Sequence, residues 1–331
     1  MNQLSNGFTL FLSLLVEAMP FLLLGVLLSS LLVIFVDEGK LIKFMPKQPI
    51  LGALVGSLLG FLFPVCECGN VPVARRLISQ GIPASVAVGF LLSAPTINPI
   101  VIWATWTAFR DQPEIVLMRV GLSFAIATIV GSIFGSQKDL RTFLQPNIAL
   151  QLARQSVEIP TKPQPQSAIP TGTFFIGQPL IPLEAIAVET SKNIPWQDRF
   201  NLLLDNMINE FRELGGILVI GSAIAAVIQV GIPRDIILNL GQGAVSSVVA
   251  MMILAAVVSI CSTVDAFFAL SFASTFTTGS ILAFLVFGPM IDLKSIGLIL
   301  TIFKKRALLY LFLISAQLTF LGCLFINLRV S

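Results

Sequence analysis

The chain has 331 residues, of which 56% are hydrophobic and 11% charged, and its net charge is +3. Soluble domains carry about 25% charged residues, so this composition excludes a soluble globular protein and indicates an integral membrane protein. The sequence contains no histidine, which excludes Ser-His-Asp and Cys-His catalysis and removes the commonest zinc ligand. We therefore expect neither an enzyme nor a cofactor, and the sparse basic residues do not predict nucleic-acid binding.

The first apolar run, 10–35, predicts a membrane-spanning helix, because about 20 apolar residues cross a bilayer. No Lys or Arg precedes Lys40, and the run is too long for the hydrophobic core of a signal peptide. We expect this helix to stay in the protein. Glu17 lies well inside it. Because intramembrane carboxylates are usually functional or paired, Glu17 is a candidate carrier of a coupling proton, with a buried structural pair as the alternative.

Nine further apolar runs follow in chain order and predict an all-α, polytopic helical bundle of about 8–10 segments. The lipid bilayer is its expected surrounding, and the inner or plasma membrane its expected location. The runs cover 50–65, 72–94, 97–110, 115–135, 212–231, 243–260, 262–288, 290–303 and 307–327.

A polar stretch divides these runs into two groups of five. Its centre, Ile159–Gln166, contains three prolines and predicts an extended, disordered linker. The predicted organisation is a first membrane half over 1–136, a polar linker over 137–205 and a second membrane half over 206–331.

The two halves share landmarks in the same order and at nearly constant offsets, which predicts an internal duplication. An odd number of spans in each half would invert the second half. With ten spans and an outside N-terminus, Lys40–Lys47 and Lys304–Arg306 would lie on the inner side, as the positive-inside rule favours. Parallel halves of four spans each remain the alternative. The paired landmarks are Glu17 with Glu213, Cys66 with Cys261, Pro95 with Pro289, and Asn98 with Asp292.

Phe63–Pro72 contains two prolines, a glycine, two thiols and a carboxylate within an apolar region. Lipid tolerates such a break only where the freed backbone groups are buried in protein or line a cavity. Thiolates suit soft metals and metalloids, so Cys66 and Cys68 are candidate ligands. Buried cysteines that pack as small hydrophobes are the alternative. Three sulfurs would converge if Cys261 lies opposite Cys66.

A second pair of breaks follows Pro95 and Pro289. Inverted-repeat transporters bind substrate where discontinuous helices meet near the midplane, and the runs that follow both prolines are too short to span comfortably. The alternative is proline kinks that merely shape the bundle. The predicted substrate-binding residues are Cys66, Cys68, Asn70, Pro95, Asn98, Cys261, Asp265, Pro289 and Asp292.

Asp265 and Asp292 lie at the breaks of the second half and could bind a cation or carry a coupling proton. The alternative is a buried structural pair with a basic residue. The possible partners are Arg75, Arg76 and Lys294.

Glu213 is a second coupling candidate, although Glu213 and Glu210 could instead mark a helix start, where negative charge is favoured. Arg75 and Arg76 could form a gate or an anion-attracting mouth. The alternative for both arginines is snorkelling to the membrane interface.

Residues 66–73 followed by 90–99, and residues 261–267 followed by 284–294, resemble the signature of the permease family that includes the ArsP organoarsenical efflux permeases. The resemblance implies a membrane permease for a small solute or ion, and it covers both membrane halves but not the linker. Members linked to trivalent arsenicals are expected to use cysteine thiols. The first predicted helix has no cysteine, so efflux of a metal, metalloid or organoarsenical is a lead rather than an assignment.

Three other functions stay open. A passive channel would share the fold and the site but lack coupling. An intramembrane thiol oxidoreductase would use Cys66 and Cys68, and a non-transporting assembly subunit would use neither. The Walker pattern is absent, so we expect coupling to a proton or ion gradient, or no coupling, rather than direct use of ATP. The sequence is also compatible with a homo-oligomer.

Overall fold

The computed structural model describes residues 2–35, 45–46, 48–63, 65–137, 142–150, 196–231 and 243–330. Before the predicted linker, its main helices are α1 (Asn2–Phe35), α3 (Pro49–Leu62), α4 (Glu67–Ser79), α5 (Ala84–Ile97), α6 (Pro99–Ala108) and α7 (Pro113–Gly135). After it, they are α10 (Trp196–Gly231), α12 (Ala244–Val258), α13 (Asp265–Leu270), α14 (Thr278–Met290), α15 (Leu293–Ile299) and α16 (Lys305–Val330). The expected all-α fold is confirmed.

Six helical stretches in the described residues are long and apolar enough to cross a membrane, and the expected polytopic membrane protein is thereby confirmed. Two shorter apolar helices, α3 and α12, accompany them. Large apolar side chains on the outer helices face outward, as Val16 (70% exposed) and Val227 (72% exposed) illustrate. Such exposure suits a lipid surrounding. The six stretches are Ser5–Leu32, Ala84–Ala108, Pro113–Gly135, Phe200–Gly231, Thr278–Ile299 and Lys305–Arg329.

Two predicted helices are wrong, because the chain interrupts both. The run 72–94 is divided between α4 and α5 at a turn where Gly81 has φ 79° and Pro83 caps the next helix. Glycine adopts this left-handed conformation without steric cost, and proline begins the new direction. The run 262–288 is divided between α13 and α14 by residues 271–277. Hydropathy does not register these turns because the residues around them stay largely apolar.

Helix α10 begins at Trp196, inside the stretch predicted as linker. The predicted helix start near 212 is therefore wrong, and Glu213 and Glu210 lie within a helix rather than at its start. The extra turns mix polar residues such as Asn201 and Asp205 with apolar ones, of which Leu203 is buried. A search for continuous apolar runs overlooks such a mixed segment. Residues 151–195, including Ile159–Gln166, lie outside the described residues.

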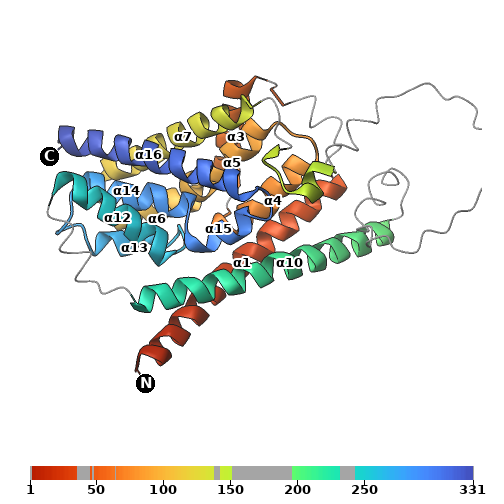
Figure 1. Cartoon of the computed structure of the whole chain (residues 1–331), viewed down its shortest axis with the longest axis horizontal. Helices are drawn as coiled ribbons and strands as arrows, with labels where there is room; N and C mark the ends of the chain where they lie inside the picture. The colour runs from red at the N-terminus through yellow and green to blue at the C-terminus, as the bar shows by residue number, and fades with distance from the viewer. Residues whose placement is uncertain are drawn as a thin grey trace, which may run out of the picture.

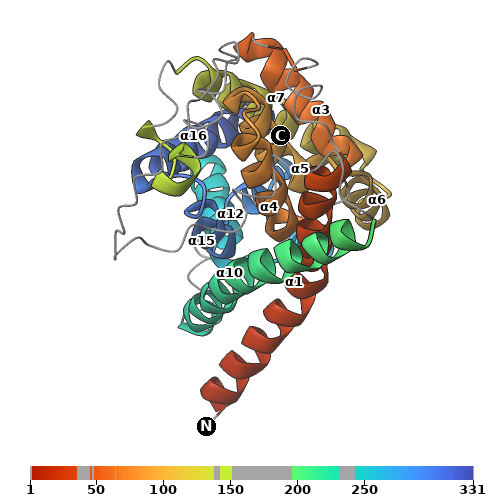
Figure 2. The same cartoon turned by 90° about the vertical axis from the view of Figure 1, so that its right-hand side faces the viewer.

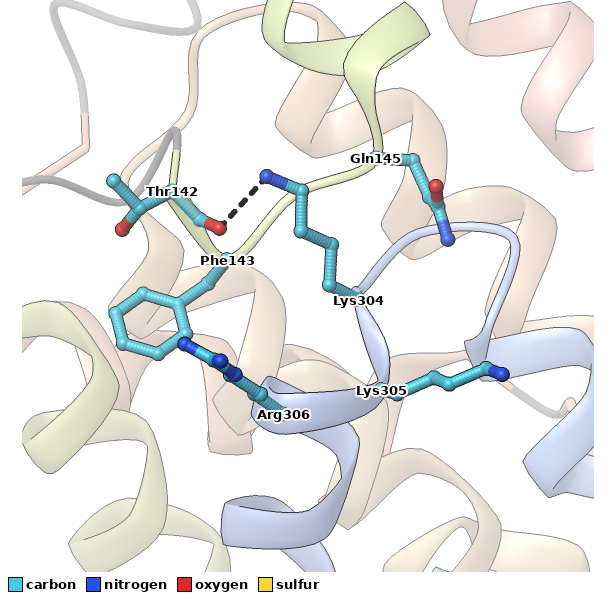
Figure 3. A pocket seen from close by; sticks show the side chains of 6 residues that line it. All are labelled: Thr142, Phe143, Gln145, Lys304, Lys305 and Arg306. Carbon is cyan, nitrogen blue, oxygen red and sulfur yellow. Dashed lines mark hydrogen bonds between the residues drawn. The ribbon is translucent and has the colours of Figure 1, made fainter.

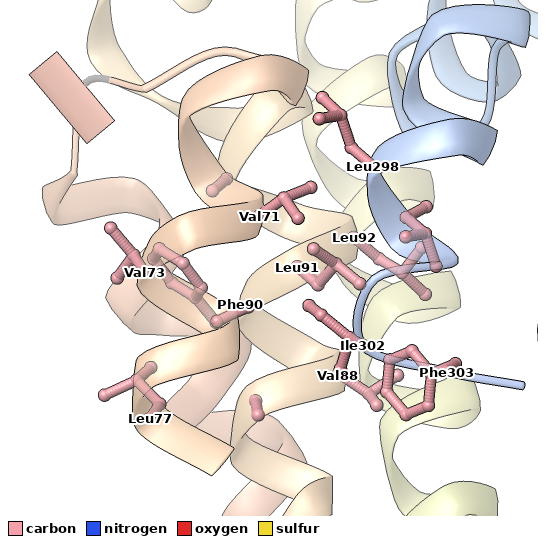
Figure 4. Packing of buried hydrophobic residues seen from close by; sticks show 14 of the residues in the cluster. Val71, Val73, Leu77, Val88, Phe90, Leu91, Leu92, Leu298, Ile302 and Phe303 are labelled. Atoms are coloured by element: carbon pink, nitrogen blue, oxygen red, sulfur yellow. The ribbon is translucent and has the colours of Figure 1, made fainter. Parts of the chain in front are cut away.

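The broken helices form the centre of the bundle. Helix α5 packs on α3, α4, α7 and α14, whereas α14 packs on α12, α16, α7 and α5. Helices α1 and α10 lie side by side along one flank, and the N-terminal end of α1 projects beyond the bundle (Figures 1 and 2). Figure 4 shows the core between α4, α5 and the end of α15, where Val71, Phe90 and Leu298 are buried. The predicted breaks therefore lie on the most buried elements.

Candidate functional site

The first break turns at Cys66, which precedes α4 in an extended conformation. Its carbonyl oxygen accepts hydrogen bonds from the amide N–H groups of Gly69 (3.1 Å) and Asn70 (3.0 Å). The carbonyl of Cys261 does the same for Val264 (2.9 Å) and Asp265 (3.0 Å). Both cysteines therefore begin a helical turn through the same backbone pattern.

The residues that follow these cysteines also correspond. The thiol of Cys68 interacts with that of Cys66, and the hydroxyl of Thr263 donates to Cys261 Sγ at 3.5 Å. Glu67 and Ser262 are both buried. Among the described residues, neither Glu67 Oε2 nor Ser262 Oγ has a hydrogen-bond partner. At each break, therefore, the cysteine sulfur interacts with a neighbouring side chain, and one buried side-chain oxygen has no hydrogen-bond partner among the described residues.

The second pair of breaks is capped by Asn98 and Asp292. Asn98 Oδ1 accepts from the N–H of Val101 at 2.9 Å, and Asp292 Oδ1 accepts from the N–H of Ser295 at 2.6 Å. A side-chain acceptor at this position satisfies one of the free N–H groups of a helix start. Asn98 and Asp292 therefore hold the starts of α6 and α15.

Hydrogen bonds join the two breaks within each half. Asn98 Nδ2 donates to the carbonyl of Val65 at 3.3 Å, next to Cys66. In the second half, the N–H of Leu293 donates to Ser259 Oγ at 3.2 Å. Ser259 has φ 48° at the C-cap of α12, a left-handed conformation that is uncommon outside glycine.

The thiols of Cys66, Cys68 and Cys261 meet in the buried core. The Cys66 thiol interacts with both of the others. The ligand atoms of Cys66, Glu67 and Cys261 all lie within 4.8 Å of one another. Two soft sulfurs and a carboxylate could hold a thiophilic metal ion. Cys323 is buried in a separate cluster around α12, α14 and α16.

Lys294 brings a positive charge to the thiols. Its Nζ lies 3.8 Å from Glu67 Oε1, and both side chains are nearly inaccessible. Lys294 also interacts electrostatically with Asp292 and Glu17. Glu17 Oε1 and Asp292 Oδ2 have no hydrogen-bond partner among the described residues. The centre therefore holds more buried acceptors than donors, which suits a ligand that brings positive charge or hydrogen-bond donors.

Asp265 makes a bidentate ion pair with Arg119 of α7. Arg119 Nη2 lies 2.6 Å from Asp265 Oδ2, and Nη1 lies 3.1 Å from Oδ1 and 2.8 Å from the hydroxyl of Thr105. Both charged side chains are at most 2% exposed. The partner of Asp265 is thus Arg119 and not one of the three basic residues that the sequence suggested.

Arg75 and Glu213 form a pair at the periphery. Arg75 Nη1 lies 2.9 Å from Glu213 Oε2, and their side chains are 22% and 50% exposed. This pair joins α4 to α10 but does not belong to the thiol cluster. Arg76 is partly buried, and its Nε has no hydrogen-bond partner among the described residues.

The remaining predicted residues line the breaks. Pro95 and Pro289 are buried inside the last turns of α5 and α14, and both helices end within a few residues of them. Asn70 Nδ2 donates to the carbonyl of Leu91 at 2.6 Å, which fastens α4 to α5. Asn70 Oδ1 has no partner among the described residues.

Sequence reasoning missed Glu67 and Arg119 and treated Lys294 only as a partner. Arg119 carried a usable signal, because a charge within the apolar run 115–135 indicates a buried partner or a pathway. Glu67 carried a signal too, because it is a carboxylate between two cysteines inside an apolar region.

Comparison with known proteins identifies the family of this chain. A family model described as "Predicted permease" matches residues 3–328. The chain is 38% identical over 299 residues to the UPF0718 protein YcgR of Bacillus subtilis (strain 168), covering 90% of this chain and 89% of the relative. It is 29% identical over 321 residues to the "Putative two-component membrane permease complex subunit" of Streptococcus mutans serotype c, covering 96% and 94%. No solved structure matches. The chain belongs to the predicted permease family, and it is a membrane permease.

Proposed function

We propose that this permease moves a small solute across the inner or plasma membrane by alternating access, and that the solute is a thiophilic metal ion or metalloid carried outward. The observation that carries this proposal is that the ligand atoms of Cys66, Glu67 and Cys261 lie within 4.8 Å of one another at the helix breaks, with Cys68 next to Cys66. Soft thiol ligands select such solutes, and discontinuous helices are the usual place for a transported substrate.

The proposed movement rests on an inverted duplication of the two halves. The matching hydrogen bonds at Cys66 and Cys261 support the duplication, as do the matching caps at Asn98 and Asp292. Transporters of this kind rock one repeat against the other around a fixed site. The same architecture without coupling would be a passive channel.

Among the described residues, two buried ion pairs cross between the halves, and we take them as support for the proposed rocking movement. Asp265 holds Arg119 tightly, at 2.6 Å, whereas Glu67 and Lys294 are 3.8 Å apart. Glu67 of α4 pairs with Lys294 of α15, and Arg119 of α7 pairs with Asp265 of α13, so each pair joins elements of opposite halves. We propose that the loose pair closes and the tight pair opens as access changes sides.

The test is flux of phenylarsine oxide, Hg²⁺ and Cd²⁺ in proteoliposomes, together with resistance of cells that lack the gene. Cys66→Ser and Cys261→Ser should abolish flux of the transported probe. Cys323→Ser is the matched control, because this buried cysteine lies outside the thiol cluster, and it should leave flux unchanged. Equal flux in all three variants would exclude a thiol-based solute site.

Imposed ion gradients separate a coupled permease from a channel. A coupled permease accumulates solute against its own gradient when a proton or sodium gradient is applied, whereas a channel only equilibrates it. Accumulation that collapses with a protonophore would assign a proton as the coupling ion.

The contact between Cys66 and its two neighbouring thiols also favours one alternative, an intramembrane thiol oxidoreductase. Such an enzyme would cycle between thiols and a disulfide. Alkylation of membranes during turnover, followed by mass spectrometry, would find a Cys66 disulfide in a substantial fraction of molecules. A permease would keep all three thiols alkylatable after denaturation.

The name of the Streptococcus mutans relative describes one subunit of a two-component permease complex. We propose that this chain, too, works beside a second membrane subunit. Reconstitution of the purified chain alone tests this, since full flux without any other protein would remove the need for a second component.

A further inference from the structure

A second polar feature lies apart from the thiol cluster, where α15 ends and α16 begins. A pocket of about 520 Å³ opens there and is lined by Thr142, Phe143, Gln145, Lys304, Lys305 and Arg306. Figure 3 shows three cationic side chains spreading from this helix start. No acidic residue is among the described residues that line it.

The concentration of positive charge is unfavourable without an anion. Lys305 and Arg306 lie in the first turn of α16, and this turn carries no acidic side chain. The N-terminus of a helix already carries a partial positive charge and free N–H groups. Three adjacent cations at such a place repel one another, and an anionic group would relieve this repulsion.

The pocket walls are held in place by hydrogen bonds. Leu144 pairs with Phe303 in an antiparallel bridge, and the N–H of Lys304 donates to the carbonyl of Phe143 at 2.8 Å. Lys304 Nζ donates to the carbonyl of Thr142 at 2.9 Å (Figure 3). Gln145 Nε2 donates to the carbonyl of Leu300 at 2.8 Å. These bonds therefore fix the backbone around the pocket and the position of Lys304.

The position of the pocket indicates what fills it. It lies between the candidate spans Thr278–Ile299 and Lys305–Arg329, where one ends and the next begins. One and two turns further along α16, the side chains of Leu309, Tyr310 and Leu313 are 55%, 52% and 51% exposed. Residues four apart share a helix face, so an apolar strip continues from the cations toward the bilayer interior.

We infer that this pocket binds the headgroup of an anionic phospholipid, whose acyl chains lie along Leu309, Tyr310 and Leu313. The anionic headgroup of such a lipid would lie against the three cations, and its apolar acyl chains would continue along the exposed apolar residues of α16. The predicted topology places these cations on the inner side of the membrane, where anionic lipids attract Lys and Arg.

Native mass spectrometry of the purified permease, titrated with dioleoyl phosphatidylglycerol and dioleoyl phosphatidylcholine, tests the inference. The variant Lys305→Gln/Arg306→Gln leaves the bond from Lys304 to Thr142 intact. We expect phosphatidylglycerol to bind in preference to phosphatidylcholine, and the variant to weaken its binding by about tenfold or more.

Arg110→Gln/Arg329→Gln is the matched control. It removes the same charge from exposed positions before α7 and near the end of α16, and it should keep the preference. Equal weakening in both variants, or no preference for phosphatidylglycerol, would overturn the inference. Displacement of the lipid by inorganic phosphate, but not by chloride at equal ionic strength, would assign a free anion and overturn the lipid.

Discussion

Arg119 and Asp265 show what a charge inside the membrane requires. Arg119 lies within the span Pro113–Gly135 and is 1% exposed, so it has no access to water. Its two terminal nitrogens bind the two carboxylate oxygens of Asp265, and one of them also binds Thr105. This fork geometry satisfies a buried guanidinium better than a single contact would. The pair stabilises the fold mainly because neither charge is left alone.

Removing one member of the pair should destabilise the protein strongly. Arg119→Met leaves Asp265 buried without its partner, and we expect a loss of about 3–5 kcal/mol in the free energy of unfolding. Arg119→Met/Asp265→Leu removes both charges and should recover much of that loss. Denaturant titration of the detergent-purified protein measures each value.

Arg110→Met is the control, because Arg110 is exposed in the turn before α7, and it should change stability by less than about 0.5 kcal/mol. Asp265→Leu alone completes the comparison. If the double variant loses the sum of the two single losses, the residues act independently and the pair has no coupling energy.

Some residues of the candidate site could be predicted from the sequence, and others could not. Cys66, Cys261 and Asp292 stood out because prolines, glycines and polar groups interrupt apolar runs around them. Arg119 and Asp265 are 146 positions apart. Hydropathy reports the expected depth of a residue in the membrane but not the direction that its side chain faces, so this pairing could not be derived.

At the scale of single elements, the helix breaks depend on side-chain oxygens that accept hydrogen bonds from the next helix, and not on prolines alone. Asn98 has an amide and Asp292 a carboxyl group, yet each accepts a hydrogen bond from the third residue of the helix that it begins. An N-cap needs a side-chain oxygen and not a charge, which explains why an amide and a carboxylate occupy matching positions. Alanine at either position would therefore remove the helix cap together with any contact that the side chain makes with the solute.

The sequence predicted the breaks after Pro95 and Pro289 but not the turns that separate α4 from α5 and α13 from α14. Proline leaves a visible mark on a sequence because it ends helices. The turn at Gly81 and residues 271–277 leave a weaker mark, because apolar segments surround them on both sides. The predicted start of helix α10 was too late for a different reason, because polar residues such as Asn201 and Asp205 interrupt the apolar pattern of its first turns.

The crossing of α1 and α4 depends on two glycines. A Cβ at Gly25 would clash with the backbone of Gly69, including its carbonyl oxygen. Gly25→Ala must push the helices apart, and we expect it to destabilise the protein by about 1–3 kcal/mol. It should also reduce flux, because α1 carries Glu17 beside Lys294.

Gly121→Ala is the matched substitution. Gly121 lies within α7, and nothing lies within 4 Å of a Cβ built there, so alanine should keep or slightly raise the thermal midpoint. Thermal unfolding of both variants in one detergent compares them. Equal midpoints for the two variants would contradict a tight crossing at Gly25.

In the whole molecule, the two halves of the chain interleave. Helix α1 packs on α10, α5 on α14, and α7 on α16, while α4 packs on α15 and α6 on α13. The sequence predicted the order of the halves and the matching of their landmarks. It could not predict the interleaving, since contacts between segments far apart in sequence leave no local pattern.

Because the halves interleave, we expect them to stay together without an intact linker. A protease site placed within 159–166 would cut the chain in the Pro-rich stretch. We expect the two pieces to elute together from size-exclusion chromatography in mild detergent and to keep flux, because the buried thiol cluster and the pairs Glu67–Lys294 and Arg119–Asp265 all join the halves. Cutting Arg119→Met should give more separated pieces than cutting the unaltered chain. Complete separation of the unaltered pieces would contradict this prediction. It would show that the contacts between the halves do not hold them together, so a substrate site between the halves could not be maintained.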